Sequence, residues 1–249
     1  MTKVAVLSDI HGNLQALRAV LDDVHRQGPD FVVCAGDLVV YGPFPNECVA
    51  LVRACKIVTV MGNRDWAVAV RQPGEGYAVP VGRRREVEVG LYGWTDRTIS
   101  EENRAFLAGL PRRLRLRVGQ TELLVVHGTC RSPFEYLRVD DDESLFTELA
   151  EVSRADVIVA GHTHVPFWRR VGEAGGPLGE VLFANAGSVG WPKDRRPEAA
   201  YLELTVNGRE VRAETRRIAY PVEETVAAMR QAGLPETLME ALTLGTEIR

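Results

Sequence analysis

A regular alternation of short apolar runs and helical patterns between Lys3 and Val60 constrains the fold most strongly. The runs Lys3–Leu7, Asp30–Cys34 and Lys56–Val60 predict strands, because each is apolar and only a few residues long. Between them, Asn13–Gln27 and Pro45–Ala54 place their apolar residues at helical spacing. This order of three strands and two helices predicts an α/β fold with a mainly parallel sheet and helices packed on it.

The rest of the chain is richer in strand patterns. In Arg113–Val118, arginines alternate with aliphatic residues, and the turn Gly119-Gln120 leads into the run Thr121–Val126. Together these later strands predict a second sheet within one domain over residues 1–249. Its further strands are expected at Val157–Ala160, Val181–Asn185, Ala200–Val206 and Val211–Arg217, the last two joined by a hairpin turn at Asn207-Gly208.

Two segments lie outside the predicted sheets. Gln72–Ser100 contains many glycines and arginines, and we expect a loop or helical cap over the face where the strand ends meet. The segment 221–249 contains two predicted helices, Glu223–Gln231 and Glu236–Leu244. Their apolar residues pack either on the domain or on a second copy of the chain, so the sequence leaves a homo-oligomer open.

Composition excludes several classes of protein. With 45% hydrophobic and 26% charged residues, the chain has the make-up of a soluble globular protein. A net charge of -4 argues against a nonspecific nucleic-acid binder, which normally carries a basic surface. We find neither a signal peptide nor the roughly 18 apolar residues of a membrane helix. The 4 cysteines form no CxxC pair, so we expect buried thiols and a cytoplasmic location.

Polar residues follow five of the predicted strands, at the point where each strand ends. In every case aspartate, asparagine or histidine comes next, usually beside a glycine. Because ligands bind at the carboxyl ends of strands in open α/β sheets, we expect these side chains to lie close together. The five segments are Asp9-Ile10-His11, Gly36-Asp37, Gly62-Asn63-Arg64-Asp65, His127-Gly128 and Gly161-His162-Thr163-His164.

The donor atoms in these segments suit two metal ions. Nitrogen and oxygen donors without thiolate favour Mn, Fe, Co, Ni or Zn over Ca or Mg, and manganese is one of the metals we expect. Any one of the histidines alone is most simply a turn residue, but five such segments in strand order indicate a metal site. Only His25, on the first helix, lies elsewhere. The expected ligands are Asp9, His11, Asp37, Asn63, His127, His162 and His164.

These motifs resemble the five motifs of the calcineurin-like metallophosphoesterase superfamily. The segments Asp9–Leu14 and Gly36–Asn46 are also similar to its small bacterial and archaeal phosphodiesterase branch. The resemblance implies a sandwich of two mixed β-sheets flanked by helices, with the metal site at the strand C-terminal edge. By motif position, one metal takes Asp9, His11, Asp37 and His164, and the other takes Asp37, Asn63, His127 and His162, so that Asp37 bridges.

The expected activity is therefore that of a dinuclear phosphoesterase, most simply a phosphodiesterase. A hydroxide that bridges two divalent cations attacks phosphorus in line with the leaving group. Arg64 stands where many members of the superfamily have histidine; it cannot act as a general acid but can hold a phosphate oxygen. A surface pairing with Asp65 is the other interpretation. We expect catalytic roles for Asp37, Asn63, Arg64, Asp65 and His127, with Asn63 and Arg64 also binding substrate.

Three other functions stay open at this point. A phosphomonoesterase or a dinucleoside-polyphosphate hydrolase would use the same metals, so the ligands do not separate them from a phosphodiesterase. A non-catalytic scaffold of the same fold is disfavoured because all the expected ligands are present. Tyr41, Phe44 and Trp94 either stack on a nucleobase of the substrate or pack in the core.

Overall fold

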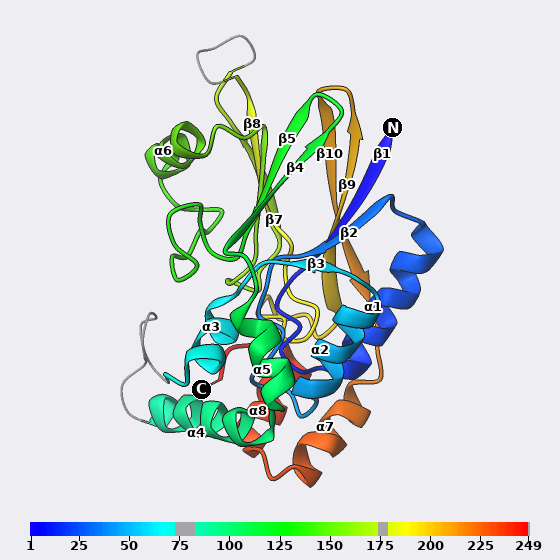
Figure 1. Ribbon diagram of the computed structural model, residues 1–249, viewed down its shortest axis with the longest axis vertical. Helices are drawn as coiled ribbons and strands as arrows, with labels where there is room; N and C mark the ends of the chain where they lie inside the picture. Colours follow the sequence, from blue (N-terminus) through cyan, green and yellow to red (C-terminus); the bar gives the residue numbers. More distant parts are fainter. Residues whose placement is uncertain (73–82, 174–178, 249) are drawn as a thin grey trace.

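Two five-stranded mixed sheets face each other in the computed structural model, which describes residues 1–72, 83–173 and 179–248 (Figure 1). The first sheet has the order β10-β9-β1-β2-β3, and the second has the order β4-β5-β6-β8-β7. The strands of the first sheet are β1 (Thr2–Leu7), β2 (Phe31–Cys34), β3 (Val58–Thr59), β9 (Ala199–Asn207) and β10 (Glu210–Ile218). Those of the second are β4 (Arg113–Val118), β5 (Thr121–Val126), β6 (Val157–Ala160), β7 (Phe167–Val171) and β8 (Val181–Asn185).

Each sheet contains three neighbouring strands that run parallel. In the first sheet β1 pairs with β2 in a register that joins Leu7 to Cys34, and β2 continues the parallel pairing with β3. In the second sheet β6 lies between β5 and β8, parallel to both, and all four of its residues are buried. Because parallel strands end at the same edge of a sheet, the polar segments that follow β1, β2, β5 and β6 come together at one edge.

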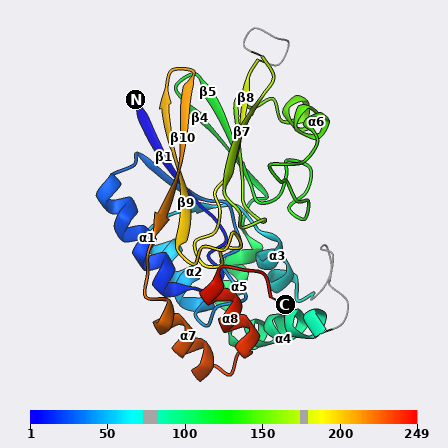
Figure 2. The same cartoon turned by 180° about the vertical axis from the view of Figure 1, so that it is seen from behind.

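Helices cover the two outer faces of the sandwich. Figures 1 and 2 show α1 along the first sheet, α6 beside the second, and most of the other helices gathered at one end of the molecule. The helices are α1 (Leu14–Gln27), α2 (Pro45–Ala54), α3 (Asn63–Val70), α4 (Arg83–Thr98), α5 (Glu101–Ala108), α6 (Glu143–Ser153), α7 (Val222–Gln231) and α8 (Glu236–Leu244). None of the helices in the described residues is long and apolar enough to cross a membrane.

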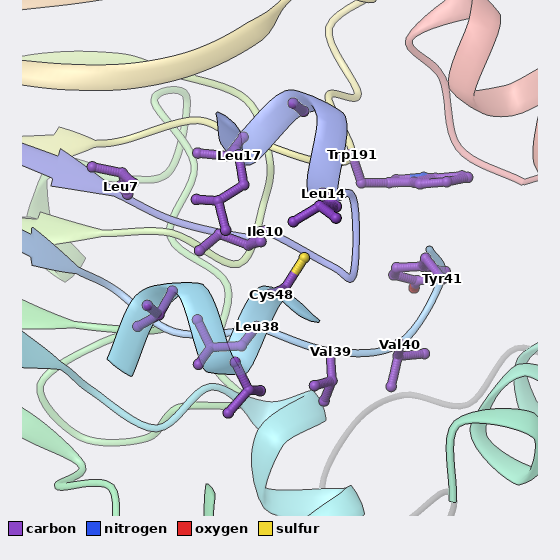
Figure 3. Packing of buried hydrophobic residues seen from close by; sticks show 14 of the residues in the cluster. Leu7, Ile10, Leu14, Leu17, Leu38, Val39, Val40, Tyr41, Cys48 and Trp191 are labelled. Carbon is purple, nitrogen blue, oxygen red and sulfur yellow. The ribbon is translucent and has the colours of Figure 1, made fainter. Parts of the chain in front are cut away.

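Three buried apolar layers hold the elements together. Between the sheets, Val4 and Val6 belong to the same cluster as Val125 and Val159, which excludes water from the inner faces. Outside the second sheet, Phe146 of α6 packs on Phe183 of β8 with ring centroids 5.0 Å apart. Outside the first sheet, the helices share a large cluster whose centre is drawn in Figure 3, including Ile10, Leu14, Leu17, Leu38 and Cys48.

Most predicted elements are confirmed, and the exceptions lie in both halves of the chain. The prediction that all later strands build the second sheet is wrong, because β9 pairs antiparallel with β1 and carries β10 into the first sheet. The strand expected at Lys56–Val60 is limited to Val58–Thr59. No strand was expected where β7 forms, and no helix where α3, α5 and α6 form.

The segments predicted as a cap and as C-terminal helices have clear structures where they are described. Within Gln72–Ser100, α4 occupies Arg83–Thr98, and residues 73–82 lie outside the described residues. The C-terminal helices pack on the chain itself, since their apolar side chains are buried in the large helical cluster. The prediction of buried thiols is wrong for Cys55, which is exposed, and right for Cys34 and Cys48.

Candidate metal centre

The loops after the strands are joined to one another by backbone hydrogen bonds. Beyond β1 and β2, the N–H groups of Asp9 and His11 donate to the carbonyls of Gly36 and Asp37, at 2.9 and 3.0 Å. In the second sheet, the N–H of Gly161 donates to the carbonyl of His127 at 2.8 Å. The side chains that follow these strands are therefore carried on a rigid backbone rather than on independent loops.

Five of the seven expected ligands have a left-handed backbone. Their φ angles lie between 50° and 67°, a region that L-residues other than glycine seldom adopt. Aspartate, asparagine and histidine tolerate it better than most residues, which matches the residue types found here. This conformation turns successive side chains toward the same edge. The five residues are Asp9, His11, Asp37, His162 and His164.

Glycines let the carboxylates approach neighbouring loops. A Cβ on Gly62 would lie 2.1 Å from Asp37 Oδ1, and a Cβ on Gly161 would lie 2.6 Å from Asp9 Oδ2. Both distances are shorter than any van der Waals contact. The glycines of these two motifs are therefore required by close packing against Asp9 and Asp37.

Asp9, His11 and His164 form the first group of donors. Their ligand atoms lie within 4.8 Å of one another, and all three side chains are buried. Asp9 Oδ2 accepts hydrogen bonds from Ser8 Oγ at 2.6 Å and from the N–H of His162 at 3.0 Å. The other oxygen, Oδ1, faces His164 Nε2 at 3.2 Å and His11 Nε2 at 3.5 Å but has no hydrogen-bond partner among the described residues.

Asp37, His127 and His162 form the second group, again with ligand atoms within 4.8 Å. Asp37 Oδ1 accepts a hydrogen bond from the N–H of Arg64 at 2.7 Å. Asp37 Oδ2 lies 3.4 Å from His127 Nε2 and 3.7 Å from His11 Nε2, so it lies between the two groups. The amide oxygen of Asn63 lies 2.9 Å from His127 Nε2.

The histidine ring orientations suit metal binding. The Nδ1 atoms of His11, His127 and His164 point at the backbone carbonyls of Val39, Ala35 and Trp191, to which they can donate. That tautomer leaves a lone pair on each Nε2, directed at the carboxylates. His11 Nε2 and His164 Nε2 are 3.2 Å apart, and His162 Nε2 is buried without a partner in the described chain. When these imidazoles are neutral, acceptor atoms face one another in a buried site, and a cation would satisfy them, so the donor set fits metal ions.

The pKa values of the two carboxylates reflect this arrangement. Burial alone would raise the pKa of Asp9 and Asp37, but the neighbouring histidines outweigh burial and hold both pKa values well below the usual range. Both residues are therefore ionised at neutral pH. Asp65 differs, because burial and the charge of Asp37 raise its pKa.

The histidines divide into two kinds. Burial lowers the pKa of His162, with a further contribution from His127. Burial and the nearby Lys193 lower the pKa of His164 to about 4. Burial also opposes the charged form of His127, but Asp37 outweighs it and raises the pKa to about 9. Neutral His162 and His164 can bind a metal ion at once, whereas binding at His127 releases a proton.

The residues of the Gly62–Asp65 motif have distinct roles in the structure. Asp65 accepts hydrogen bonds from the N–H groups of Asp37 and Leu38, both at 2.8 Å, and from Gly62 at 3.0 Å, so it fixes the loop that carries Asp37. The guanidinium of Arg64 forms an ion pair with Glu88 of α4 at 2.8 Å. The same group donates to the hydroxyl of Tyr41 at 2.7 Å.

The sequence reasoning missed several residues around these groups. Glu88 lies in the segment without a readable pattern, and Lys193 and Tyr136 lie in connections between elements. Tyr136 stacks on His162 with ring centroids 4.1 Å apart. Tyr41, for which the sequence left two roles open, is buried and its ring contacts that of His11. It also stacks on Trp191, and Figure 3 shows both side chains. His25 is exposed on α1, away from the donors.

The two-sheet sandwich and its paired donor groups define the class of metallophosphoesterases. The chain belongs to the calcineurin-like phosphoesterase superfamily, whose domain model matches residues 2–208. It is therefore a phosphoric ester hydrolase of a metal-dependent family, as the motifs predicted.

Relatives place the chain in the small bacterial and archaeal branch. A metallophosphoesterase from Sphaerobacter thermophilus has a crystal structure with a TM-score of 0.77 and 32% identity, covering 98% of this chain and 99% of that one. The uncharacterized protein MJ0912 of Methanocaldococcus jannaschii is 32% identical over 97% of this chain and 98% of its own length. The phosphodiesterase YfcE of Escherichia coli is 25% identical over 79% and 84%.

Proposed function

We propose that the chain is a dinuclear-metal-dependent phosphodiesterase, with Asp37 as the ligand shared by both ions. The position of Asp37 Oδ2 carries this proposal, because it lies within 3.7 Å of one ring nitrogen from each donor group. Asp9, His11 and His164 would complete one site, and Asn63, His127 and His162 the other. The similarity to the phosphodiesterase YfcE supports the choice of a diester.

Two divalent cations bound to these ligands would supply an activated water for in-line attack and would neutralise charge on the phosphoryl group. The protein residues hold this chemistry in place. Asp65 fixes the Asp37 loop, and the carbonyls of Ala35, Val39 and Trp191 orient three imidazoles. The guanidinium of Arg64 is held by Glu88 and Tyr41, and a guanidinium held in place can bind a non-bridging phosphate oxygen.

A substrate panel with metals tests the proposal. Metal-free protein would be assayed alone and with Mn²⁺, Ni²⁺, Zn²⁺ or Mg²⁺ on bis-p-nitrophenyl phosphate, p-nitrophenyl phosphate, a cyclic nucleotide and a dinucleoside polyphosphate. We expect two bound ions per chain and the highest kcat/KM on a diester. A preference for the monoester or the polyphosphate would assign the same metal centre to that class instead. Full metal occupancy without hydrolysis of any ester would indicate a scaffold.

Arg64→Ala tests the phosphate role within the same assay. We expect a lower kcat/KM on the diester with two ions still bound, because the Arg64 side chain is not a ligand. Unchanged kcat/KM would remove Arg64 from the mechanism.

The identity of manganese as the native metal, the oligomeric state and the cytoplasmic location stay predictions.

A further inference from the structure

A cavity of about 190 Å³ opens beside the metal centre, and we call it the side cavity. Thr163, which lies between His162 and His164 in the chain, forms part of its wall. Tyr136 forms another part and stacks on the ring of His162, with centroids 4.1 Å apart and planes 19° apart. The side cavity therefore adjoins the loop that carries His162 and His164, next to where a phosphate at the metal centre would lie.

Apolar side chains make up much of the wall. Phe167 lies at the inner side, and Val139 and Val165 line the cavity while remaining 48% and 37% exposed. An apolar ligand group placed here would remove these valines from water, which favours binding by about 25 cal/mol for each Å² covered. The wall therefore suits an organic substituent of the substrate better than it suits hydrated ions.

The charges around the side cavity balance. Arg138 and Lys193 face it together with Asp140 and Glu247, so two cations are matched by two carboxylates. Arg138 also lies over the ring of Tyr136, 4.7 Å from its centroid. A polyphosphate chain would place several negative charges against this balanced wall. Because the two carboxylates cancel the attraction of the two cations, a neutral substituent suits this wall better than a polyanion.

Lys193 differs from the other charged residues of the wall. Its N–H donates to the carbonyl of His164 at 3.4 Å, which ties its backbone to the ligand loop. Lys193 is half-buried, and the carboxylate of Glu247, which also lines the cavity, favours its charged form. A phosphate oxygen within reach of this ammonium group would accept a charge-assisted hydrogen bond.

We propose that the side cavity binds a neutral, ring-sized ester group of the substrate while Lys193 contacts a phosphate oxygen. This rests on the proposed function, since it assigns the substrate's phosphorus to the metal centre. The volume supports a single ring, because sites for larger organic ligands occupy roughly 300–1,000 Å³. The substrate class is therefore a phosphodiester with one aryl or similarly sized apolar arm, rather than a dinucleoside polyphosphate.

Binding of phosphonates, which resist hydrolysis, tests this assignment without relying on turnover. Calorimetry on manganese-loaded protein would compare phenylphosphonate, methylphosphonate and inorganic phosphate. We expect phenylphosphonate to bind at least about tenfold more tightly than methylphosphonate, because a ring gains far more apolar contact than a methyl group. Equal affinities of the two phosphonates would overturn the proposal.

Two matched variants test whether the ring of phenylphosphonate binds in the side cavity. Val139→Trp fills the mouth of the side cavity and should bring the two phosphonate affinities to within about twofold. Val152→Trp, at a valine 59% exposed on α6, should keep the tenfold preference. A preference that survives Val139→Trp unchanged would place the ring elsewhere and refute the assignment.

Lys193→Gln should lower the affinity for all three anions about tenfold, because the lost contact is to the phosphate part of each. The preference for phenylphosphonate over methylphosphonate should be kept. Lys193→Arg should restore most of the affinity. Unchanged phosphate affinity in Lys193→Gln would remove Lys193 from the site. Hydrolysis of bis-p-nitrophenyl phosphate by the wild-type protein reports separately on the proposed function, so a failed cavity and a failed catalytic centre are distinguishable.

Discussion

The ion pair between Arg64 and Glu88 connects α4 to the candidate metal centre, and the energetic effect of removing it can be calculated. The two groups are 2.8 Å apart, and their side chains are only 11% and 4% exposed. Tyr41 links them further, since its hydroxyl accepts from Arg64 and donates to Glu88 at 3.2 Å. At an effective dielectric constant of about 20, the attraction is about 6 kcal/mol, of which the desolvation of both charges offsets the larger part.

A double-mutant cycle measures the part of this attraction that remains after desolvation is subtracted. We expect Arg64→Ala and Glu88→Ala each to lower the free energy of unfolding by about 3 kcal/mol, because each leaves a buried charge with fewer partners. The double variant should lose about 4 kcal/mol rather than 6, which gives a coupling of about 2 kcal/mol. Urea unfolding of chelator-treated protein provides these values. The exposed pair Arg71 and Glu101, treated in the same way, should show a coupling of at most about 0.5 kcal/mol.

Kinetics on the same variants separate positioning from catalysis. If Glu88 acts by holding Arg64, Glu88→Ala lowers kcat/KM in the wild-type background and has no further effect after Arg64→Ala. Metal content should stay at the wild-type level in all three variants, because neither side chain is a proposed ligand. A coupling below about 0.5 kcal/mol, or equal kinetic losses in both backgrounds, would refute the role given to Glu88.

Three further predictions concern the ligands, a motif glycine and acid stability. Asp37→Asn should lower the content of both metal ions, measured by mass spectrometry. The control Asp22→Asn, at an exposed position, should not change the metal content. Full metal occupancy with normal turnover in Asp37→Asn would disprove the shared ligand. Gly62→Ala should weaken metal binding and destabilise the fold by about 1–3 kcal/mol, because its Cβ would lie 2.1 Å from Asp37 Oδ1. The control is Gly90→Ala, whose Cβ would meet no atom within 4 Å. Burial opposes ionisation of Asp23, but Arg216 and Tyr201 outweigh it and lower its pKa to about 2. The associated stability, about 1–2 kcal/mol, is present above pH 4 and lost between pH 4 and pH 2, and Asp23→Asn should remove that step from unfolding curves measured against pH.

The proposed ligands could be chosen from the sequence because each follows an apolar run directly. A strand end locates its next residues without knowledge of distant contacts, and parallel strands bring such ends to one edge. Glu88 and Lys193 carry no such local signal. Both residues come near the candidate metal centre only through tertiary packing. Glu88 is brought there by α4, and Lys193 by the connection before β9.

The wrong assignment of β9 and β10 has a similar cause. The turn Asn207-Gly208 predicts the hairpin, and the structure confirms the hairpin from Ala199 to Ile218. Which sheet receives the hairpin depends on the antiparallel pairing of β9 with β1, between Val4 and Leu204 for example. Apolar periodicity does not distinguish two sheets that both offer an apolar inner face.

The backbone strain at the metal centre could not be predicted and has consequences for stability. Positive φ angles at Asp9, His11, Asp37, His162 and His164 cost about 1 kcal/mol each, so the five together are comparable to the net stability of a small protein. The backbone hydrogen bonds between these loops hold the strained conformation in place. A cation that binds only this conformation stabilises the folded state further. We therefore expect the loops and the metal ions to unfold as one cooperative unit, with the unfolding temperature falling as the ions are removed.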